Sequence, residues 1–259
     1  MKRTYFYLFS LVMTLTSCVN GIAPSKNKIT KKYSVEAFDN IASQGTVNIV
    51  FKQSNATTVE AYGPDNIISS LIVTSEDSTL HISMKKGVKF RSLKNNNVTI
   101  TITAPKLSSI SQQGTGNITL KDSVKVDDIK ITSNGTGNFK ADELTADNIS
   151  VRSDGIGNVI LKGKAEKASY HIKGIGNLNA KDMIVSDVVV EQKGIGNVSC
   201  YASGKITVST NGIGNVDYFG HYKIFCVNGN TGFRKEFRIF YFIHLQNEED
   251  YERKESSSA

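Results

Sequence analysis

The chain has 259 residues, of which 39% are hydrophobic and none is Trp, and its formal net charge is +7. This is little apolar material for a large compact core, but a thin solenoid tolerates it because each coil buries only a few side chains. The basic balance does not indicate nucleic acid, because the N-terminus predicts export; anionic glycans or lipid head groups are the partners that it would favour.

Residues 1–17 have the pattern of a secretory signal peptide. Lys2 and Arg3 precede an apolar run that is too short to span a bilayer as a mature helix. The run ends in Leu-Thr-Ser-Cys18, which resembles a bacterial lipobox, in which the Cys is acylated and becomes the mature N-terminus. We therefore predict lipidation at Cys18, including palmitate, and a stable membrane anchor. The alternative is an ordinary signal peptide followed by an accidental Cys.

This N-terminus predicts an exported protein that is lipid-anchored in the cell envelope, with the outer membrane of a Gram-negative cell as its location. Residues 18–32 are polar and rich in Lys, so beyond the lipidated Cys they predict a flexible tether. They lack the acidic cluster that resembles a surface-export signal. The sequence therefore leaves open whether the protein faces the periplasm or the cell surface.

Residues 33–110 alternate between apolar and polar side chains in short runs separated by turn signals, which predicts β-strands. No segment of the mature chain has helical periodicity. The stretch Ile41–Ile49 parallels Ile110–Ile118, with Val47 in place of a glycine. It therefore looks like a worn copy of the motif that dominates the second half.

That motif is Gly-x-Gly-Asn, and it recurs six times with successive first glycines 21, 20, 19, 20 and 18 residues apart. A near-constant period is the signature of one structural unit stacked many times. The turn residues predicted from it are Gly114, Gly116, Asn117, Gly135, Gly137, Asn138, Gly155, Gly157, Asn158, Gly174, Gly176, Asn177, Gly194, Gly196, Asn197, Gly212, Gly214 and Asn215.

Apolar columns flank each motif, so each coil reads as a strand, a tight corner, a second strand and a variable return. About 20 residues per coil predicts an all-β protein, a parallel β-solenoid in which like columns stack at about 4.8 Å. We expect both corner glycines to face inward, where the two sheets converge and a Cβ would clash. We expect the Asn side chains to bond to the turn and to the next rung as a ladder.

The residue between the two glycines is predicted to point outward. It is Thr in the first two copies and then Ile156, Ile175, Ile195 and Ile213. A contiguous apolar row marks either an interaction edge, which would suit a ligand or a homo-oligomer, or a ladder of Ile side chains that pack on one another.

The lipobox, the β-rich first half and the Gly-x-Gly-Asn ladder resemble the family called putative auto-transporter adhesin, head GIN domain, over residues 33–232. The resemblance implies a right-handed β-helix of two sheets with Gly-x-Gly corners between them. It implies no shared catalytic residues, and it suggests a role in adhesion.

The C-terminal residues 233–259 depart from the repeat. An aromatic run, Phe233–Leu245, is interpreted either as a cap on the open end of the solenoid or as an atypical tail with little structure. Residues 246–259 are charged and rich in Ser, which predicts disorder.

The polar residues give no catalytic or cofactor signature. The carboxylates recur at strand starts or turns, and the four His lie in separate segments with no nucleophile partner visible, so no catalytic residue, metal or cofactor is predicted. Cys200 and Cys226 fall in different columns, which favours two buried thiols over a disulfide.

The sequence thus predicts a non-enzymatic binding or adhesion module. Its expected partners are the membrane through the lipid anchor, and a glycan or an envelope or host surface ligand. One alternative is an enzyme acting on anionic polysaccharide in a β-helix groove. Another is a structural envelope protein that assembles through the Ile edge.

Overall fold

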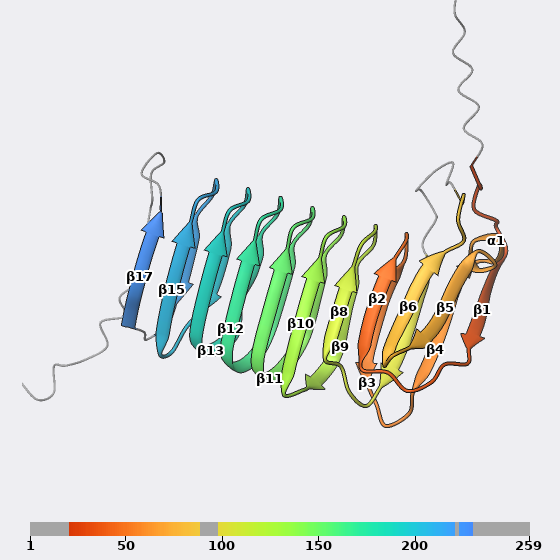
Figure 1. Cartoon of the computed structure of the whole chain (residues 1–259), viewed down its shortest axis with the longest axis horizontal. Helices are drawn as coiled ribbons and strands as arrows, with labels where there is room; N and C mark the ends of the chain where they lie inside the picture. The colour runs from red at the N-terminus through yellow and green to blue at the C-terminus, as the bar shows by residue number, and fades with distance from the viewer. Residues whose placement is uncertain (1–20, 89–97, 221–222, 230–259) are drawn as a thin grey trace, which may run out of the picture.

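A computed structural model describes residues 21–88, 98–220 and 223–229 (Figure 1). It is 66% strand and 2% helix, and its parallel coils stack about 20 residues apart to form a β-solenoid. This confirms the fold class predicted from the repeat. The signal peptide, Cys18 and residues 233–259 lie outside the described residues.

The strands and the single described helical turn have the following bounds: β1 Lys28–Tyr33, β2 Asn40–Gln44, β3 Asn48–Gln53, β4 Thr58–Pro64, α1 Asp65–Ile68, β5 Leu71–Glu76, β6 Thr79–Met84, β7 Thr99–Ala104, β8 Ser109–Gln112, β9 Ile118–Lys125, β10 Asp128–Ser133, β11 Phe139–Ser153, β12 Val159–Ile172, β13 Leu178–Gln192, β14 Val198–Tyr201, β15 Lys205–Thr210, β16 Val216–Phe219 and β17 Lys223–Gly229.

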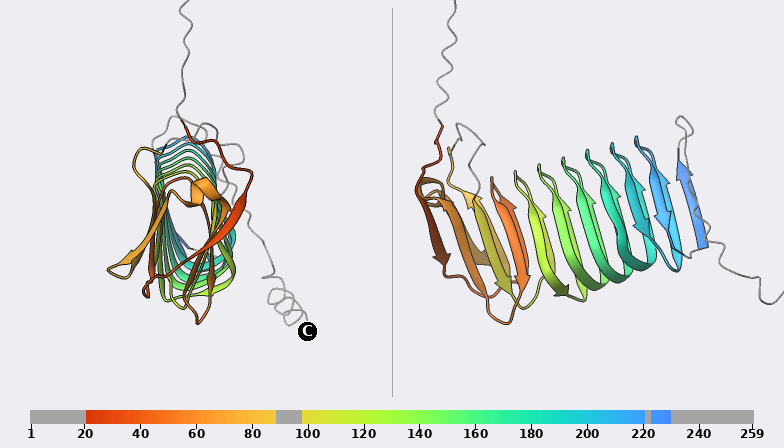
Figure 2. Two further views of the ribbon diagram at one scale, coloured as in Figure 1. Left: turned by 90° about the vertical axis from the view of Figure 1, so that its right-hand side faces the viewer. Right: turned by 180° about the vertical axis from the view of Figure 1, so that it is seen from behind.

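The coils form two sheets that share one edge of corners. Sheet A contains the strands that lead into the corners: β2, β8, β10, the last parts of β11, β12 and β13, then β15 and β17. Sheet B contains the strands that leave them: β3, β9, the first parts of β11 to β13, then β14 and β16. Figure 2 shows the stack from its end, with a flattened cross-section and the sheets on its long sides.

The core consists of alternate side chains from both sheets. On sheet A the coils contribute stacked pairs such as Ile129 with Ile131 and Val188 with Val190, all of them buried. The outward neighbours along the same strands are mostly polar or charged, such as Lys130 and Glu191, with the exposed Val189 as an apolar exception. Period-two alternation therefore decides which residues lie inside and which are offered to ligands.

The worn copy of the motif forms the coil that stacks against the first intact motif. Ile41 pairs with Ile110 and Thr46 with Thr115, in the register that the sequence parallel predicts. Val47 occupies the position of the second corner glycine and is buried. On the other side of this coil, β2 pairs with β6 and β3 with β7, also in parallel, so the parallel stack extends well beyond the first intact motif.

An antiparallel layer covers the N-terminal end of this stack. β1 pairs with β4, β4 with β7 and β5 with β6, all antiparallel, and α1 follows β4 directly. Sequence periodicity did not predict α1, because one turn of four residues is too short to show a helical pattern.

The prediction that residues 18–32 form a flexible tether was wrong for residues 28–32. β1 begins at Lys28 and pairs with β4 along its whole length. Ile29 and Tyr33 pack against the core, and this contact outweighs the polar composition of the segment.

Candidate functional site: the corner edge and sheet A

The corner glycines are required by the approach of the preceding coil. A Cβ built on Gly155 would overlap the carbonyl oxygen of Gly135, and one on Gly157 would overlap that of Gly137. The same relation holds at every intact copy. The clash is therefore along the stack, with the previous rung, and not across the core where the two sheets were expected to converge. Gly157 also has φ of 148°, which disfavours any other residue.

The corner asparagines form a continuous chain of hydrogen bonds. Each Oδ1 accepts the backbone N–H of the Asn in the next coil at 2.8–3.0 Å, from Asn48 through Asn197. In the middle of the stack the side chains are also linked, with Asn177 Nδ2 donating to Asn158 Oδ1 at 3.0 Å. The ladder satisfies backbone N–H donors at the corner that no sheet partner reaches. It therefore fixes the position of each corner relative to the corner of the next coil.

Four isoleucines project from the corners into solvent. Ile156, Ile175, Ile195 and Ile213 expose 54%, 51%, 48% and 54% of their surface, so packing on one another leaves about half of each side chain uncovered. Successive residues of the row are joined by parallel bridges. We call these four residues the Ile ridge, and the whole row from Thr46 through Thr115 and Thr136 to Ile213 the crest.

Charged residues flank the Ile ridge on the side of sheet A. Lys173 and Lys193 are exposed and directly precede the corner glycines of their coils. Asp154 occupies the same position one coil earlier, and its carboxylate accepts a hydrogen bond from Arg152 Nε at 2.7 Å. The opposite flank is the uncharged Asn ladder.

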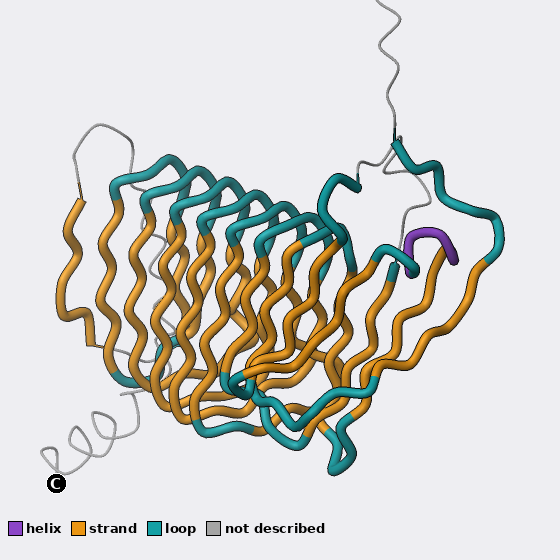
Figure 3. Tube along the Cα trace, turned by 45° about the vertical axis from the view of Figure 1, so that its right-hand side comes forward, coloured by secondary structure: helices purple, strands orange, loops and turns teal. Residues whose placement is uncertain are grey.

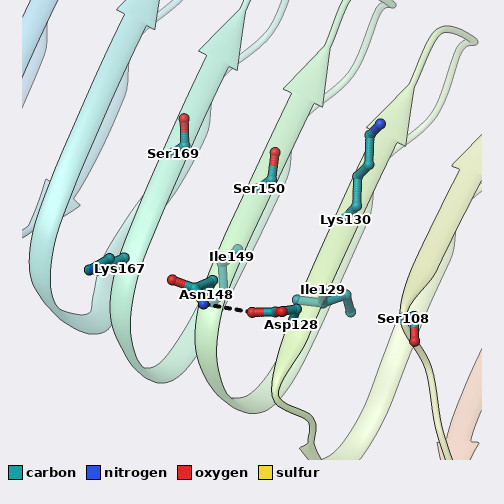
Figure 4. Close-up of a pocket in the computed structure, with 9 residues that line it drawn as sticks. All are labelled: Ser108, Asp128, Ile129, Lys130, Asn148, Ile149, Ser150, Lys167 and Ser169. Atoms are coloured by element: carbon teal, nitrogen blue, oxygen red, sulfur yellow. Dashed lines mark hydrogen bonds between the residues drawn. The ribbon is translucent and has the colours of Figure 1, made fainter.

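Sheet A carries an open groove of about 300 Å³ (Figure 4). Its floor is Ile129 and Ile149, and its walls are polar side chains from four coils: Ser108, Asp128, Lys130, Asn148, Ser150, Lys167 and Ser169. Asn148 Nδ2 donates to Asp128 Oδ1 at 2.6 Å. Hydroxyls, an amide and two amines at the regular spacing of strands are groups that can bond to a polar, anionic chain lying across the sheet.

His171 has a nucleophile partner, contrary to the expectation from sequence. Its Nε2 lies 2.9 Å from Ser169 Oγ and its Nδ1 lies 2.7 Å from Glu191 Oε2. With Nδ1–H donating to Glu191, Nε2 is left to accept the Ser169 hydroxyl, which is the bonding order of a nucleophile, base and carboxylate. The spacing of these residues could have predicted the network from the sequence. His171 lies two residues after Ser169, on the same face of the strand, and Glu191 lies 20 residues further on, which is one coil period.

Electrostatics around this network hold Glu191 ionised. Hydrogen bonds from Lys193 and then His171 lower the pKa of Glu191 to about 2. Ser169 lies mid-strand between β11 and β13, where backbone N–H groups belong to the ladders on either side. An oxyanion would find no pair of backbone donors at this position.

Other features of the described residues bear on chemistry. Cys200 is buried and free, and burial raises its pKa to about 12. Within the described ranges, no three His, Cys, Asp or Glu side chains are grouped to hold a metal ion. The helix that the structure describes there is too short to cross a membrane.

The comparisons with known proteins give the family. Residues 37–221 match the family model described as putative auto-transporter adhesin, head GIN domain. The chain is similar to the crystal structure of a putative adhesin from Bacteroides fragilis NCTC 9343, at 35% identity and a TM-score of 0.78, over 81% of this chain and 96% of that one.

Two solved structures at lower identity share the fold. One is a putative lipid binding protein from Parabacteroides distasonis ATCC 8503, at 19% identity and a TM-score of 0.60, covering 81% of this chain and 99% of that one. The other is a putative adhesin from Parabacteroides merdae ATCC 43184, at 19% identity and a TM-score of 0.58, covering 81% and 96%. No curated protein matches. Because the family model spans well over half of the chain, the protein belongs to the head GIN domain family of putative auto-transporter adhesins.

Proposed function

We propose that the protein is a lipid-anchored binding module of the cell envelope, which holds an anionic glycan on sheet A. The groove over Ile129 and Ile149 carries this proposal, because it brings polar side chains of four successive coils to one exposed surface. Support also comes from the family and from the similar Bacteroides fragilis protein, both of which are named as adhesins.

Repetition is the physical reason why this surface suits a chain-like ligand. Strands in a sheet lie about 4.8 Å apart, so equivalent side chains recur at about the length of one sugar residue. A polymer can then make the same modest contact several times, and the contacts add through effective concentration. Lys130 and Lys167 outnumber Asp128, the one carboxylate of the groove, and its net positive charge favours an anionic ligand.

The anchor is proposed on the lipobox at Cys18. It would keep the solenoid at a membrane, with the outer membrane as the proposed location. Growth with labelled palmitate, followed by mass analysis of the N-terminal peptide, should show acyl groups on Cys18, and Cys18→Ser should release the protein from the membrane fraction. A Cys18→Ser protein that stays in the membrane fraction would rule out this anchor.

The binding proposal is tested with a glycan array probed by the purified mature chain. Binding to acidic glycans should weaken about tenfold, or by about 1.4 kcal/mol, when Lys130 and Lys167 are both changed to Ala. A matched pair on sheet B, Lys121→Ala with Lys181→Ala, makes the same change in net charge and should leave binding close to that of the parent. Equal losses in both pairs would mean that charge alone, and not the groove, attracts the glycan.

The enzymatic alternative has one specific observation in its favour, which is the Ser169–His171–Glu191 network. The relatives are named for adhesion or lipid binding and not for catalysis. We expect a fluorophosphonate, which phosphonylates activated serines as the serine oxygen bonds to phosphorus and fluoride leaves, to leave Ser169 unlabelled because the site lacks oxyanion donors. Labelling that disappears in both Ser169→Ala and His171→Ala would instead favour a hydrolase that acts on esters of a polysaccharide.

A further inference from the structure

The described chain begins at the same edge of the solenoid as the corners. The register runs from Asn48 of the first corner to Thr99, from Thr99 to Tyr62 and from Tyr62 to Thr30. β1 runs away from the corners, so Lys28 lies near the level of the crest and the preceding residues lie beyond it. Figure 3 shows the start of the described chain on the side where the corners stack.

The residues before β1 are held in this place by α1. Asn66 Nδ2 donates to Ala23 O at 2.7 Å, and Asn66 Oδ1 accepts the backbone N–H of Ser25 at 3.0 Å. Asp65 binds the side chain of Asn27 at 2.9 Å and donates its own N–H to the carbonyl of Asn27. Gly21 lies three steps along the chain from Cys18, with two residues between them, which is a reach of about 10 Å when fully extended. A lipid on Cys18 would therefore hold the crest edge close to the bilayer.

The crest itself is suited to a lipid surface. It spans six steps of about 4.8 Å from Thr46 to Ile213, or about 29 Å. Its end near the anchor carries Thr, together with the exposed Tyr62, whose ring lies 5.9 Å from Lys28 Nζ. Its far end is the Ile ridge. Tyr and aliphatic residues beside Lys are typical of surfaces that rest in the head-group region.

The charge along this edge has the sign that anionic head groups attract. Lys85 and Lys86 are exposed and follow β6, whose end lies beside Gly45. Lys173 and Lys193 flank the Ile ridge further along. Asp154 is paired with Arg152 and Lys193 with Glu191, so these charges offset one another. Lys85, Lys86 and Lys173 then outnumber Asp65, whose bond to the uncharged Asn27 leaves its charge in place.

These observations favour a membrane over a second copy of the chain as the occupant of the ridge. Four half-exposed side chains in single file offer far less area than the roughly 800 Å² that each partner of a stable dimer buries. A narrow row is enough for shallow insertion when a lipid anchor already supplies the affinity. We propose that the solenoid lies along the membrane on its crest, with the Ile ridge in contact with lipid and sheet A left free to bind ligand. This inference rests on the lipid anchor proposed above.

The chain contains no Trp, so a single introduced Trp reports on its own surroundings. The full mature chain, with lipid at Cys18 verified by mass, is reconstituted in vesicles of phosphatidylethanolamine and phosphatidylglycerol that contain a brominated lipid. The reporters are Ile195→Trp and Ile175→Trp on the ridge. The matched control is Ile184→Trp, an equally exposed Ile (56%) in the return part of β13, away from the corners.

Both ridge reporters should shift to shorter wavelength on reconstitution and be quenched by the brominated lipid roughly threefold more than the control. Lipidated chains whose ridge and control reporters are quenched equally would overturn the inference and leave the anchor standing. A ridge reporter that shifts without lipid quenching, in a protein that sediments as a dimer, would assign the ridge to a second copy. Absence of lipid on Cys18 would remove both the anchor and this inference.

Discussion

At the residue scale, the absence of a side chain at the corner glycines allows successive coils to stack closely. The coils touch through backbone at this point, since the position of each missing Cβ coincides with a carbonyl oxygen of the previous coil. Backbone cannot move aside without breaking the ladder of the neighbouring rung, so the close approach excludes every residue larger than Gly.

Gly155→Ala tests this without a change in backbone preference, because Gly155 has no positive φ. We expect it to lower the free energy of unfolding by about 3 kcal/mol, as an overpacked contact. Gly204→Ala is the control, because its Cβ would meet side-chain atoms of Asp187 and Ser186 at 3.1 Å and the Ser186 carbonyl oxygen at 3.2 Å, in place of the 2.0 Å overlap at Gly155. These neighbours need to move by only a few tenths of an ångström, so the cost should stay below about 1 kcal/mol. Denaturant unfolding of both variants measures the difference. Similar losses of unfolding free energy in both variants would mean that the backbone at the corner can move enough to accommodate a Cβ.

At the scale of the element, neighbouring strands of sheet A are linked by outward side chains as well as by their backbones. His171 and Glu191 are direct partners in the pairing of β12 with β13, and their rings and carboxylates meet across the strand gap. Cross-strand pairs of this kind stabilise a sheet by amounts that depend on the charge of both groups. The network thus makes a small part of the stability sensitive to acid.

The direction of this pH dependence follows from the lowered pKa of Glu191. The folded value is about 2 and the ordinary value is 4.5, so the unfolded chain takes up the proton first as the pH falls. The contribution of Glu191 is present above about pH 4.5 and is lost between there and about pH 2. Screening at this partly exposed site limits it to about 1 kcal/mol.

Glu191→Gln should therefore flatten the acid limb of the stability curve, measured by unfolding at a series of pH values. Glu166→Gln, at an exposed carboxylate of the preceding coil, serves as the control and should retain the limb of the parent. An unchanged slope in Glu191→Gln would show that Lys193 and His171 do not hold this carboxylate in solution.

At the scale of the whole molecule, the N-terminal layer and the stack together decide at which edge the chain enters the solenoid. The antiparallel layer covers one end of the stack and turns the chain so that it enters at the crest. The corners run along that same edge in Figures 1 and 3. Sheet A, with its groove, faces sideways from this edge and is accessible in the proposed orientation.

Asn66 tests how firmly the leading segment is held. Asn66→Ala removes its hydrogen bonds to Ala23 and Ser25, each worth about 1 kcal/mol. The backbone amide of Ser25 should then exchange its hydrogen about five times faster, as measured by hydrogen exchange and mass spectrometry. Asn179→Ala, on the outer surface of sheet B, should leave this amide unchanged. Equal exchange in all three proteins would show that the segment is held by β1 alone.

The sequence by itself determined the solenoid, because a period of about 20 residues and alternate apolar columns leave few other ways to bury this chain. It also indicated that the residue between the glycines points outward, since alternation carries through the corner. The worn copy at Ile41–Ile49 could be recognised for the same reason, as its apolar columns survive the loss of one glycine.

Only the tertiary structure decided the direction of the glycine contacts, the antiparallel N-terminal layer and the Ser169–His171–Glu191 network. Each depends on which residues of different coils become neighbours, and this is set by register and by the lengths of the returns. β1 shows the reason most clearly, because a polar, Lys-rich segment reads as a tether until a partner strand is there to pair with it.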